Sequence, residues 1–289
     1  MKIVGGKWSN WSGGVVCKPK AFVAPKDEVE LAAAVRTGAG PVRVPGTGHS
    51  FTPLNATDGT IIDLSAFDGL KGFDPHTQVA TFGAATHLWE IGPLLHPLGV
   101  GLKNMGDIDR QTIGGVVGTG THGTGPTLGS FSDAVAGFRL LLANGEILHC
   151  SPEENPEIYA AGRCSFGSLG VMVEIAVKVR NAYKLSEKNF LMPIDELWEK
   201  LDDLVASNRH FEFFWFPYAD VAVCKSLNET DAPAPEPRSA EYMRARGEKR
   251  GADANMFEWI NEVLPYAPFF LRRAHRLFSG GMSAGDRVR

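Results

Sequence analysis

One glycine-rich segment constrains this chain more than any other part of its sequence. Residues 104–125 read NMGDIDRQTIGGVVGTGTHGTG, so glycine and threonine fill most of the second half of the segment. Such small side chains let a flat ring system or a dinucleotide lie directly against the backbone. A purely structural role would leave a long glycine-rich stretch inside a compact domain, at a large cost in conformational entropy. The segment therefore favours a wall of a ligand site.

A second segment, VPGTGHSFT at Val44–Thr52, places a histidine beside two glycines. Gly46 and Gly48 would let backbone amides approach a pyrophosphate, and His49 would be presented on a tight turn. The segment lacks the third glycine, the lysine and the following helix of nicotinamide-binding and ATP-binding loops. Alone, such a quartet is more often a glycine turn with a surface histidine. Together with the first segment, it predicts a cofactor loop that carries a nucleophile.

Hydrophobic periodicity predicts helices and strands in alternation over the first part of the chain, and so an α+β fold. Asn144-Gly145 lies between two apolar runs and is a strong signal for a two-residue hairpin turn. An antiparallel strand pair is therefore expected there. The expected helices cover residues 25–35, 86–96 and 156–162, and the expected strands cover 42–44, 61–64, 79–82, 138–142, 146–148 and 171–179.

The apolar pattern restarts at Tyr183, which predicts a second domain after residue 182. A strand and a helix over residues 194–204 precede an aromatic run at 211–218, which is either core or part of a substrate pocket. The run DAPAPEP at residues 231–237 predicts a loop, because proline has no amide hydrogen to donate. Two helices are then expected near residues 255–264 and 268–278, and the final residues GGMSAGDRVR show no closing element.

Charge and cysteine usage exclude several classes of protein. A net charge of -4, from 29 basic and 33 acidic residues, gives no electrostatic footprint for nucleic acid or an anionic membrane surface, so a small-molecule partner is expected. The four cysteines form no CxxC pair, which fits reduced thiols in the cytoplasm, and the histidines show no metal-ligand spacing. The N-terminus lacks an apolar signal core, and no apolar run approaches the roughly 18 residues that span a bilayer.

The order of the motifs resembles a known family. Trp8, Asn10 and Trp11 are followed by VPGTGHSFT, by segment 104–125, by GSLGVMVEIAV at 167–177 and by HFEFFWFPYAD at 210–220. This order is similar to the flavin domain of the vanillyl-alcohol oxidase superfamily, in its sugar-1,4-lactone oxidase branch. The resemblance implies a two-subdomain FAD-binding domain of that type over residues 1–182. An incomplete α+β substrate (cap) domain over residues 183–289 would follow.

The resemblance also implies where FAD would bind. His49 matches the histidine whose imidazole bonds covalently to the 8α-methyl carbon of the isoalloxazine. His122 is open between direct flavin contact and a hydrogen-bonded structural role. The cofactor-binding residues implied are Val44, Pro45, Gly46, Thr47, Gly48, His49, Ser50, Asp107, Thr112, Gly115, Thr119, Gly120, Thr121, His122 and Val171. No metal site is implied.

By the same resemblance, the chain is expected to oxidise a CH–OH group of a sugar-1,4-lactone, similar to D-arabinono- or L-gulono-lactone, or of a polyol. Hydride would pass to flavin N5, and oxygen or another electron acceptor would reoxidise the flavin. Gly106 matches a position near the flavin carbon where oxygen reacts. Its missing side chain leaves room for oxygen and favours an oxidase over a dehydrogenase.

The chain departs from the family at its C-terminal end. Family members continue with a Glu-rich strand that faces the flavin and with an HWGK-type segment, and neither occurs here, so the catalytic base is unknown. Three explanations are open: a truncated fragment, a split enzyme completed by a second chain, and a catalytically incomplete FAD-binding remnant. A half-finished cap domain would expose apolar strand edges, so poor stability is expected without a partner.

Overall fold

A computed structural model describes residues 2–216, 219–234 and 285–288 of the chain. The chain forms two compact units. Unit 1 contains Met1–Gly123 and Gly129–Asn181, and unit 2 contains Thr124–Leu128 and Ala182–Arg289. The main passage from one unit to the other thus falls between Asn181 and Ala182.

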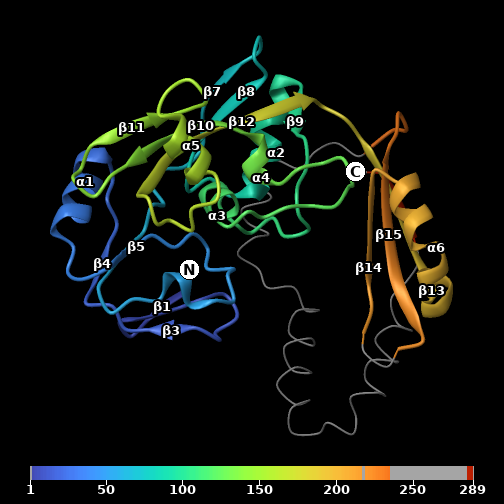
Figure 1. Ribbon diagram of the computed structural model, residues 1–289, viewed down its shortest axis with the longest axis horizontal. Coiled ribbons are helices and arrows are strands. Elements are labelled where there is room, and N and C mark those ends of the chain that lie inside the picture. Colours follow the sequence, from blue (N-terminus) through green and yellow to red (C-terminus); the bar gives the residue numbers. More distant parts are fainter. Residues whose placement is uncertain (1, 217–218, 235–284, 289) are drawn as a thin grey trace, which may run out of the picture. The chain divides into compact units, whose positions relative to one another are not determined.

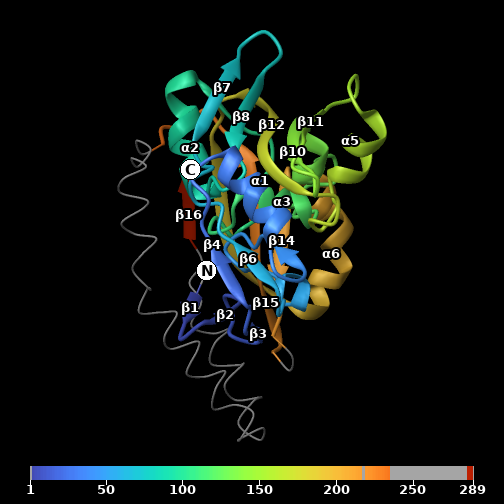
Figure 2. The ribbon, with the colours of Figure 1, turned by 90° about the vertical axis from the view of Figure 1, so that its left-hand side faces the viewer.

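Unit 1 begins with two small sheets that lie next to each other (Figures 1 and 2). The first is antiparallel, in the order β1-β2-β3, and the second is parallel, in the order β4-β6-β5. Their strands are β1 (Lys2–Val4), β2 (Lys7–Ser9), β3 (Val16–Cys17), β4 (Ala21–Val23), β5 (Val42–Arg43) and β6 (Thr60–Ile62). Trp8 in β2 is 1% exposed and anchors the antiparallel sheet.

Helix α1 (Glu28–Thr37) confirms the first predicted helix. Asp27 caps its N-terminus, where the carboxylate accepts a hydrogen bond of 2.8 Å from the Glu30 amide. Leu31 on its buried face packs against Ile62 of the parallel sheet. Arg139, in a strand described below, makes a two-pronged ion pair with Glu28 at 2.7 and 3.0 Å, which ties α1 to the larger sheet of the unit.

The larger sheet of unit 1 is antiparallel, in the order β11-β10-β12-β8-β7, with β9 paired to β12. Its strands are β7 (Leu70–Asp74), β8 (Val79–Gly83), β9 (Val100–Leu102), β10 (Val135–Leu141), β11 (Ile147–Cys150) and β12 (Val171–Asn181). Strands β10 and β11 form the predicted antiparallel pair, but the expected two-residue turn is a three-residue loop over 143–145. The Leu142 amide donates to the Glu146 carbonyl, and Gly145 alone in the loop has a positive φ, of 88°. Every second residue of β12 is buried, which confirms the predicted alternation.

The main core of unit 1 lies between the larger sheet and short helices. Phe82, Leu140 and Ile175 from the sheet pack with Ile91 and Val116 from the helices. The remaining helices of unit 1 are α2 (Leu88–Leu95), α3 (Ile113–Gly118), α4 (Phe131–Ala134), α5 (Pro156–Gly162) and the 3₁₀ turns η1 (Pro53–Asn55) and η2 (His96–Leu98). Helices α2 and α5 confirm predictions, whereas α3 lies inside the glycine-rich segment and was not predicted.

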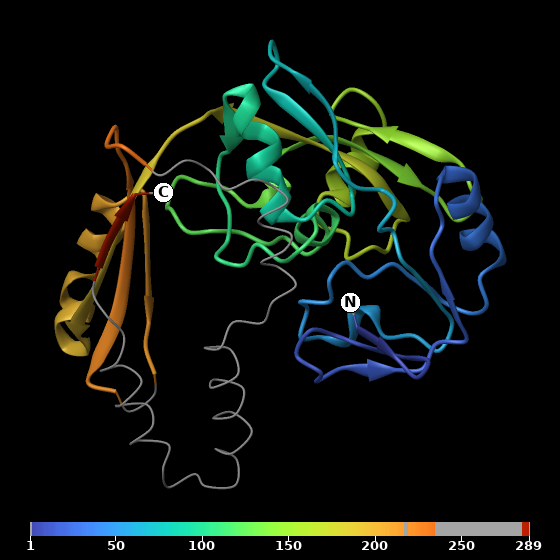
Figure 3. The same ribbon diagram turned by 180° about the vertical axis from the view of Figure 1, so that it is seen from behind.

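Unit 2 is a four-stranded antiparallel sheet in the order β14-β15-β13-β16, with helix α6 along one face (Figure 3). The elements are β13 (Leu185–Pro193), α6 (Ile194–Ser207), β14 (His210–Phe214), β15 (Val221–Glu229) and β16 (Gly285–Val288). Leu197 of α6 is fully buried against Phe211, Ala222 and Cys224. Phe211 and Phe213 of the aromatic run therefore belong to the core, while Phe214 and Trp215 are 47% and 45% exposed.

The expectation that the last residues form no closing element was wrong, because Gly285–Val288 is a strand that pairs with β13. Its sequence, GDRV, has almost no apolar character, so the strand arises from backbone pairing with an edge and not from a hydrophobic pattern. Residues 231–234 have no regular secondary structure, as predicted. The remainder of that loop, residues 235–237, and the helices predicted near 255–264 and 268–278 lie outside the described residues.

Several expected absences can be compared with the structure. In the described residues, none of the helices has the length and apolar character needed to cross a membrane. The same residues hold no group of three or more His, Cys, Asp or Glu side chains arranged to bind a metal ion. All four cysteines are free thiols.

Candidate functional site

The histidine loop, residues 44–52, lies between β5 and η1, and its backbone conformation and packing depend on its glycines. Gly48 is buried and has a φ of 77°, in the left-handed region that favours glycine. A Cβ at Gly48 would lie 3.3 Å from the Asn10 Cα and 3.5 Å from the Trp11 amide nitrogen. The loop therefore packs backbone to backbone against the turn that follows β2.

The histidine loop also contacts the glycine-rich segment, so the structure brings the two predicted walls together. A Cβ at Gly46 would lie 2.5 Å from the Thr112 Oγ1 and 3.9 Å from the Gly115 Cα. Thr112 is 7% exposed and caps α3, where its hydroxyl accepts a hydrogen bond of 3.3 Å from the Gly115 amide. Any side chain at residue 46 would collide with this cap.

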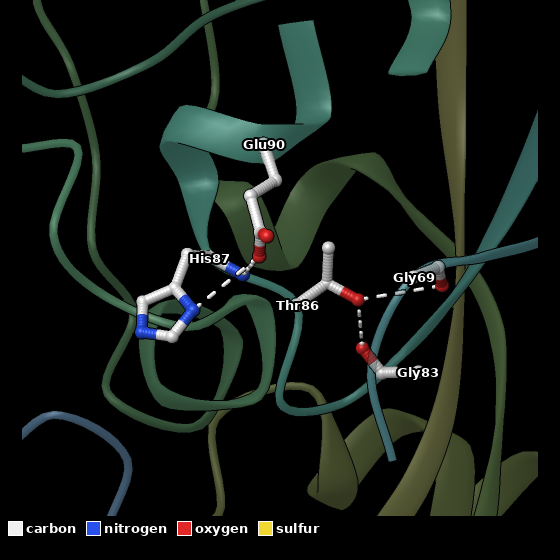
Figure 4. A network of polar contacts seen from close by, with 5 residues as sticks. All are labelled: Gly69, Gly83, Thr86, His87 and Glu90. Carbon is white, nitrogen blue, oxygen red and sulfur yellow. Dashed lines mark hydrogen bonds and ion pairs between the residues drawn. The ribbon is translucent and has the colours of Figure 1, made fainter. Parts of the chain in front are cut away.

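The start of α2 supports the start of α3. The Ile113 amide donates to the Thr86 carbonyl at 2.8 Å, and the Leu88 amide donates to the Gln111 carbonyl at 2.9 Å. Figure 4 shows how residues 86–90 are held: the Thr86 hydroxyl donates to the carbonyls of Gly83 (2.7 Å) and Gly69 (3.4 Å). These hydrogen bonds hold the start of α3, whose cap residue Thr112 contacts the histidine loop at Gly46.

A buried carboxylate completes this support. Glu90 is 5% exposed and accepts a hydrogen bond of 3.2 Å from the His87 amide, and the same carboxylate lies 3.4 Å from the His87 Nδ1 (Figure 4). The His87 ring lies 5.2 Å from the Trp89 ring, centroid to centroid. The contacts of His87 with Glu90 and Trp89 tie together the start of α2. The supporting pair with Glu90 carries no sequence signal beyond a capping pattern.

The tail of the glycine-rich segment folds back over α3. The Thr119 hydroxyl donates to the Gly115 carbonyl at 2.9 Å, and the Thr121 amide donates to the Val116 carbonyl at 2.9 Å. Gly120 has a positive φ of 65°. His122 is exposed, and its Nδ1 lies 2.9 Å from the carbonyl oxygen of Gly123. The ring of His122 therefore has a hydrogen-bond partner on its own loop.

Two of the predicted site residues stand apart from this cluster. Asp107 is exposed on the loop that precedes α3. Val171 opens β12, and its side chain packs into the core with Leu31 and Ile62. A ligand that passes Val171 would therefore meet its backbone and not its side chain.

His49 lies in a partly buried setting near positive charge. Burial lowers the pKa of His49 below its ordinary value of 6.5, and the positive charge of Arg110 adds to this effect. Its ring stacks on Trp11, with centroids 5.1 Å apart and planes 22° from parallel. At neutral pH the imidazole is consequently uncharged and keeps a free lone pair on one nitrogen.

The residues present fit FAD. Gly46 and Gly48 let the histidine loop pack closely against Thr112 and Asn10, and small residues continue from this contact into α3. The Trp8 Nε1 is buried beneath the loop without a hydrogen-bond partner, and Gly48 lies against the same ring. A neutral imidazole at His49, within the same loop as these glycines, suits a ring system that carries an electrophilic methyl group.

Comparisons with known proteins agree with this geometry. A family model described as FAD binding domain matches residues 19–151, and one described as D-arabinono-1,4-lactone oxidase matches residues 175–287. The L-gulono-1,4-lactone dehydrogenase of Mycobacterium tuberculosis is 38% identical over 234 residues, which are 80% of this chain and 54% of that protein. The L-gulonolactone oxidase of Bos taurus is 33% identical over 232 residues, which are 79% of this chain and 53% of that protein.

A third relative, the D-arabinono-1,4-lactone oxidase of Yarrowia lipolytica, is 28% identical over 80% of this chain and 45% of that protein. The chain thus spans about half the length of the curated relatives it matches. Among solved structures, a cholesterol oxidase from Brevibacterium sterolicum has a TM-score of 0.75 at 17% identity, over 98% of this chain and 60% of that chain, which shows a shared fold. The chain therefore combines a match to the FAD-binding domain family with a match to the D-arabinono-1,4-lactone oxidase family, and it is similar to sugar-1,4-lactone oxidases and dehydrogenases over most of its length.

Proposed function

We propose that this chain acts as an FAD-dependent oxidoreductase on a CH–OH group of a sugar-1,4-lactone or polyol, with FAD attached covalently to His49. The observation that carries the proposal is the meeting of the histidine loop with the α3 cap, at Gly46 and Thr112, inside the region that matches the FAD-binding family model. The names of the relatives, which are gulono- and arabinono-lactone oxidases and dehydrogenases, support the substrate class.

In this proposal FAD contacts both the histidine loop and the glycine-rich segment 104–125. Backbone amides of residues 44–50 hold the pyrophosphate, where the glycines admit close approach. Thr112 and Gly115 line the ring system, and residues 119–122 and Asp107 flank it. His122 stays a prediction, because its Nδ1 already has a partner at Gly123.

His49 would hold FAD through a bond from an imidazole nitrogen to the 8α-methyl carbon of the isoalloxazine. Forming this bond would release two protons, one from the imidazole N–H and one from the methyl group, and two electrons, and dioxygen would take these up as hydrogen peroxide. Lowering the pKa of His49 favours this step, because the protonated imidazole has no free lone pair.

When bound, FAD supplies the hydride acceptor for the substrate carbon. The chain's own contribution is to hold that cofactor rigidly. The ordered start of α3, supported by Thr86 and Glu90, gives the site a fixed wall. We also propose dioxygen or another acceptor as the oxidant of the reduced cofactor, and a cytoplasmic location, which the four free thiols support.

The test combines mass and optical spectroscopy. The intact mass of the purified chain should exceed the residue mass by one FAD, and the increment should vanish in His49→Ala. Anaerobic addition of L-gulono- or D-arabinono-1,4-lactone should bleach the flavin absorbance, and release of hydrogen peroxide in air would identify oxygen as the acceptor. An unmodified wild-type mass would refute covalent attachment. A yellow chain that no lactone or polyol bleaches would refute the oxidoreductase proposal and leave FAD binding alone.

A further inference from the structure

Residues 10 and 11 hold the histidine loop on both sides of His49. The Trp11 amide donates a hydrogen bond of 2.8 Å to the Gly48 carbonyl. The Asn10 Nδ2 donates one of 3.0 Å to the Ser50 carbonyl. The carbonyls of the two residues next to His49 are therefore bonded to two consecutive residues of another segment.

The same segment also holds the ring of His49. The Trp11 indole stacks on the imidazole with centroids 5.1 Å apart and an interplanar angle of 22°. Because the Trp11 backbone is bonded to Gly48, the indole cannot move far along the loop. One face of the imidazole is covered, and rotation of the ring is restricted.

Asn10 is itself fixed in place. Its side chain is buried at 2% exposure, and its Oδ1 accepts hydrogen bonds from the Val15 amide at 3.0 Å and the Ser12 hydroxyl at 3.3 Å. The carboxamide thus uses its oxygen to close the turn between β2 and β3 and its nitrogen to bind the histidine loop. Rotating it would break both sets of bonds, so its orientation is determined.

We propose that Asn10 and Trp11 are positioning residues that set the orientation of the His49 imidazole for covalent attachment of FAD. This inference rests on the proposed attachment at His49. Bond formation requires the attacking nitrogen to approach the methyl carbon in line with its lone pair, and a freely rotating imidazole meets that geometry only part of the time. Asn10 and Trp11 therefore act on the rate of attachment more than on the affinity for FAD.

The test follows attachment over time. Apoprotein from riboflavin-starved cells is mixed with FAD in air, and the covalently loaded fraction is read from the intact mass. Trp11→Leu and Asn10→Asp should slow attachment by about 10- to 100-fold. Trp11→Phe, which keeps a stacking ring, should recover most of the rate. Trp198→Leu is the matched control, since both tryptophans are 54% exposed and Trp198 lies in α6 of unit 2.

Two further measurements separate positioning from folding and binding. In apoprotein, the NMR signal of the His49 ring should carry a ring-current shift that disappears in Trp11→Leu and persists in Trp198→Leu. In a His49→Ala background, where no bond can form, Trp11→Leu should change the dissociation constant of FAD by less than about threefold, because positioning acts on bond formation.

The outcomes are distinguishable. If wild type attaches FAD and the Asn10 and Trp11 variants attach it at the wild-type rate, the inference is overturned and the proposed function stands. If Trp11→Leu weakens FAD binding in the His49→Ala background as much as it slows attachment, the residues serve binding and the inference also fails. If wild type never gains the mass of FAD, covalent attachment at His49 fails, and the positioning role fails with it.

Discussion

At the scale of single residues, the site depends on glycine positions where a larger side chain would collide with neighbouring atoms. The sequence predicts that Gly46 and Gly48 let backbone amides approach a pyrophosphate. The structure shows that protein atoms also lie close to both glycines. The partners are Thr112 and Asn10, which are distant along the chain, and only the folded structure shows their contacts.

Gly48→Ala should destabilise the protein more than Gly69→Ala. Both glycines have a positive φ, of 77° and 81°, so both variants lose about 1 kcal/mol to backbone strain. A methyl group at Gly69 meets nothing within 4 Å, whereas one at Gly48 lies 3.3 Å from the Asn10 Cα. We expect a further loss of about 1 kcal/mol or more at Gly48. Urea unfolding measures both, and equal losses would contradict the close packing of the loop.

Gly106→Ala should lower the reactivity with oxygen and leave the fold intact. An added Cβ lies 3.2 Å from the His122 carbonyl oxygen, so a small shift accommodates it. If the proposed flavin site is correct, the methyl group fills space beside the ring that oxygen needs. Release of hydrogen peroxide should fall by about tenfold or more, while reduction of an artificial dye stays within about twofold. A parallel fall in both rates would place residue 106 away from the path of oxygen.

At the scale of elements, the sequence predicts about half of the helices and strands of unit 1. The short elements β1–β4, β7, β9 and α4 were not predicted, and neither was α3. Its three glycines among six residues hide the helix, although Ile113, Val116 and Val117 have helical spacing and are fully buried. Burial of these three side chains outweighs the poor intrinsic propensity. Strand β16 was missed for the opposite reason, since its sequence GDRV has almost no apolar pattern.

Thr112→Val should weaken FAD binding through the cap of α3. The variant keeps the shape of threonine but loses the Oγ1 that accepts from the Gly115 amide, which costs about 1 kcal/mol of stability. Because the cap contacts Gly46, we expect the dissociation constant of FAD to rise about fivefold or more in a His49→Ala background. Thr112→Ser retains the hydroxyl and should bind nearly as the parent does. Fluorescence titration measures the dissociation constant of FAD, and equal values for the Thr112→Val and Thr112→Ser variants would contradict a role of the cap.

At the scale of the whole molecule, the sequence indicates a change of domain near residue 182 but not the transfer of Thr124–Leu128 into unit 2. That transfer depends on His210, whose Nδ1 lies 3.0 Å from the Thr124 carbonyl oxygen and 86 positions away in sequence. No local sequence pattern indicates a contact between residues so far apart in the chain. His210, for which the sequence shows only the absence of metal-ligand spacing, is buried at 6% exposure.

His210 should make the protein less stable as the pH falls. Burial lowers the pKa of His210 below 6.5, and the nearby positive charge of Arg209 adds to the shift. Below that pH the unfolded chain binds a proton that the folded chain does not, so the free energy of unfolding decreases by at most about 1.4 kcal/mol per pH unit. His210→Gln removes the titration. Between pH 7 and pH 5 the variant should lose less stability than wild type in urea titrations; identical slopes would show that His210 titrates normally.

The five residues Thr124–Leu128 have a practical consequence for anyone who dissects this protein. Because the polypeptide leaves unit 1 after Gly123 and re-enters it at Gly129, a cut at residue 182 does not yield two self-contained pieces. An excised N-terminal piece would display a short stretch stripped of its natural neighbours, and the excised C-terminal piece would have a gap where that stretch belongs. Domain swaps with homologous enzymes should therefore exchange both stretches together.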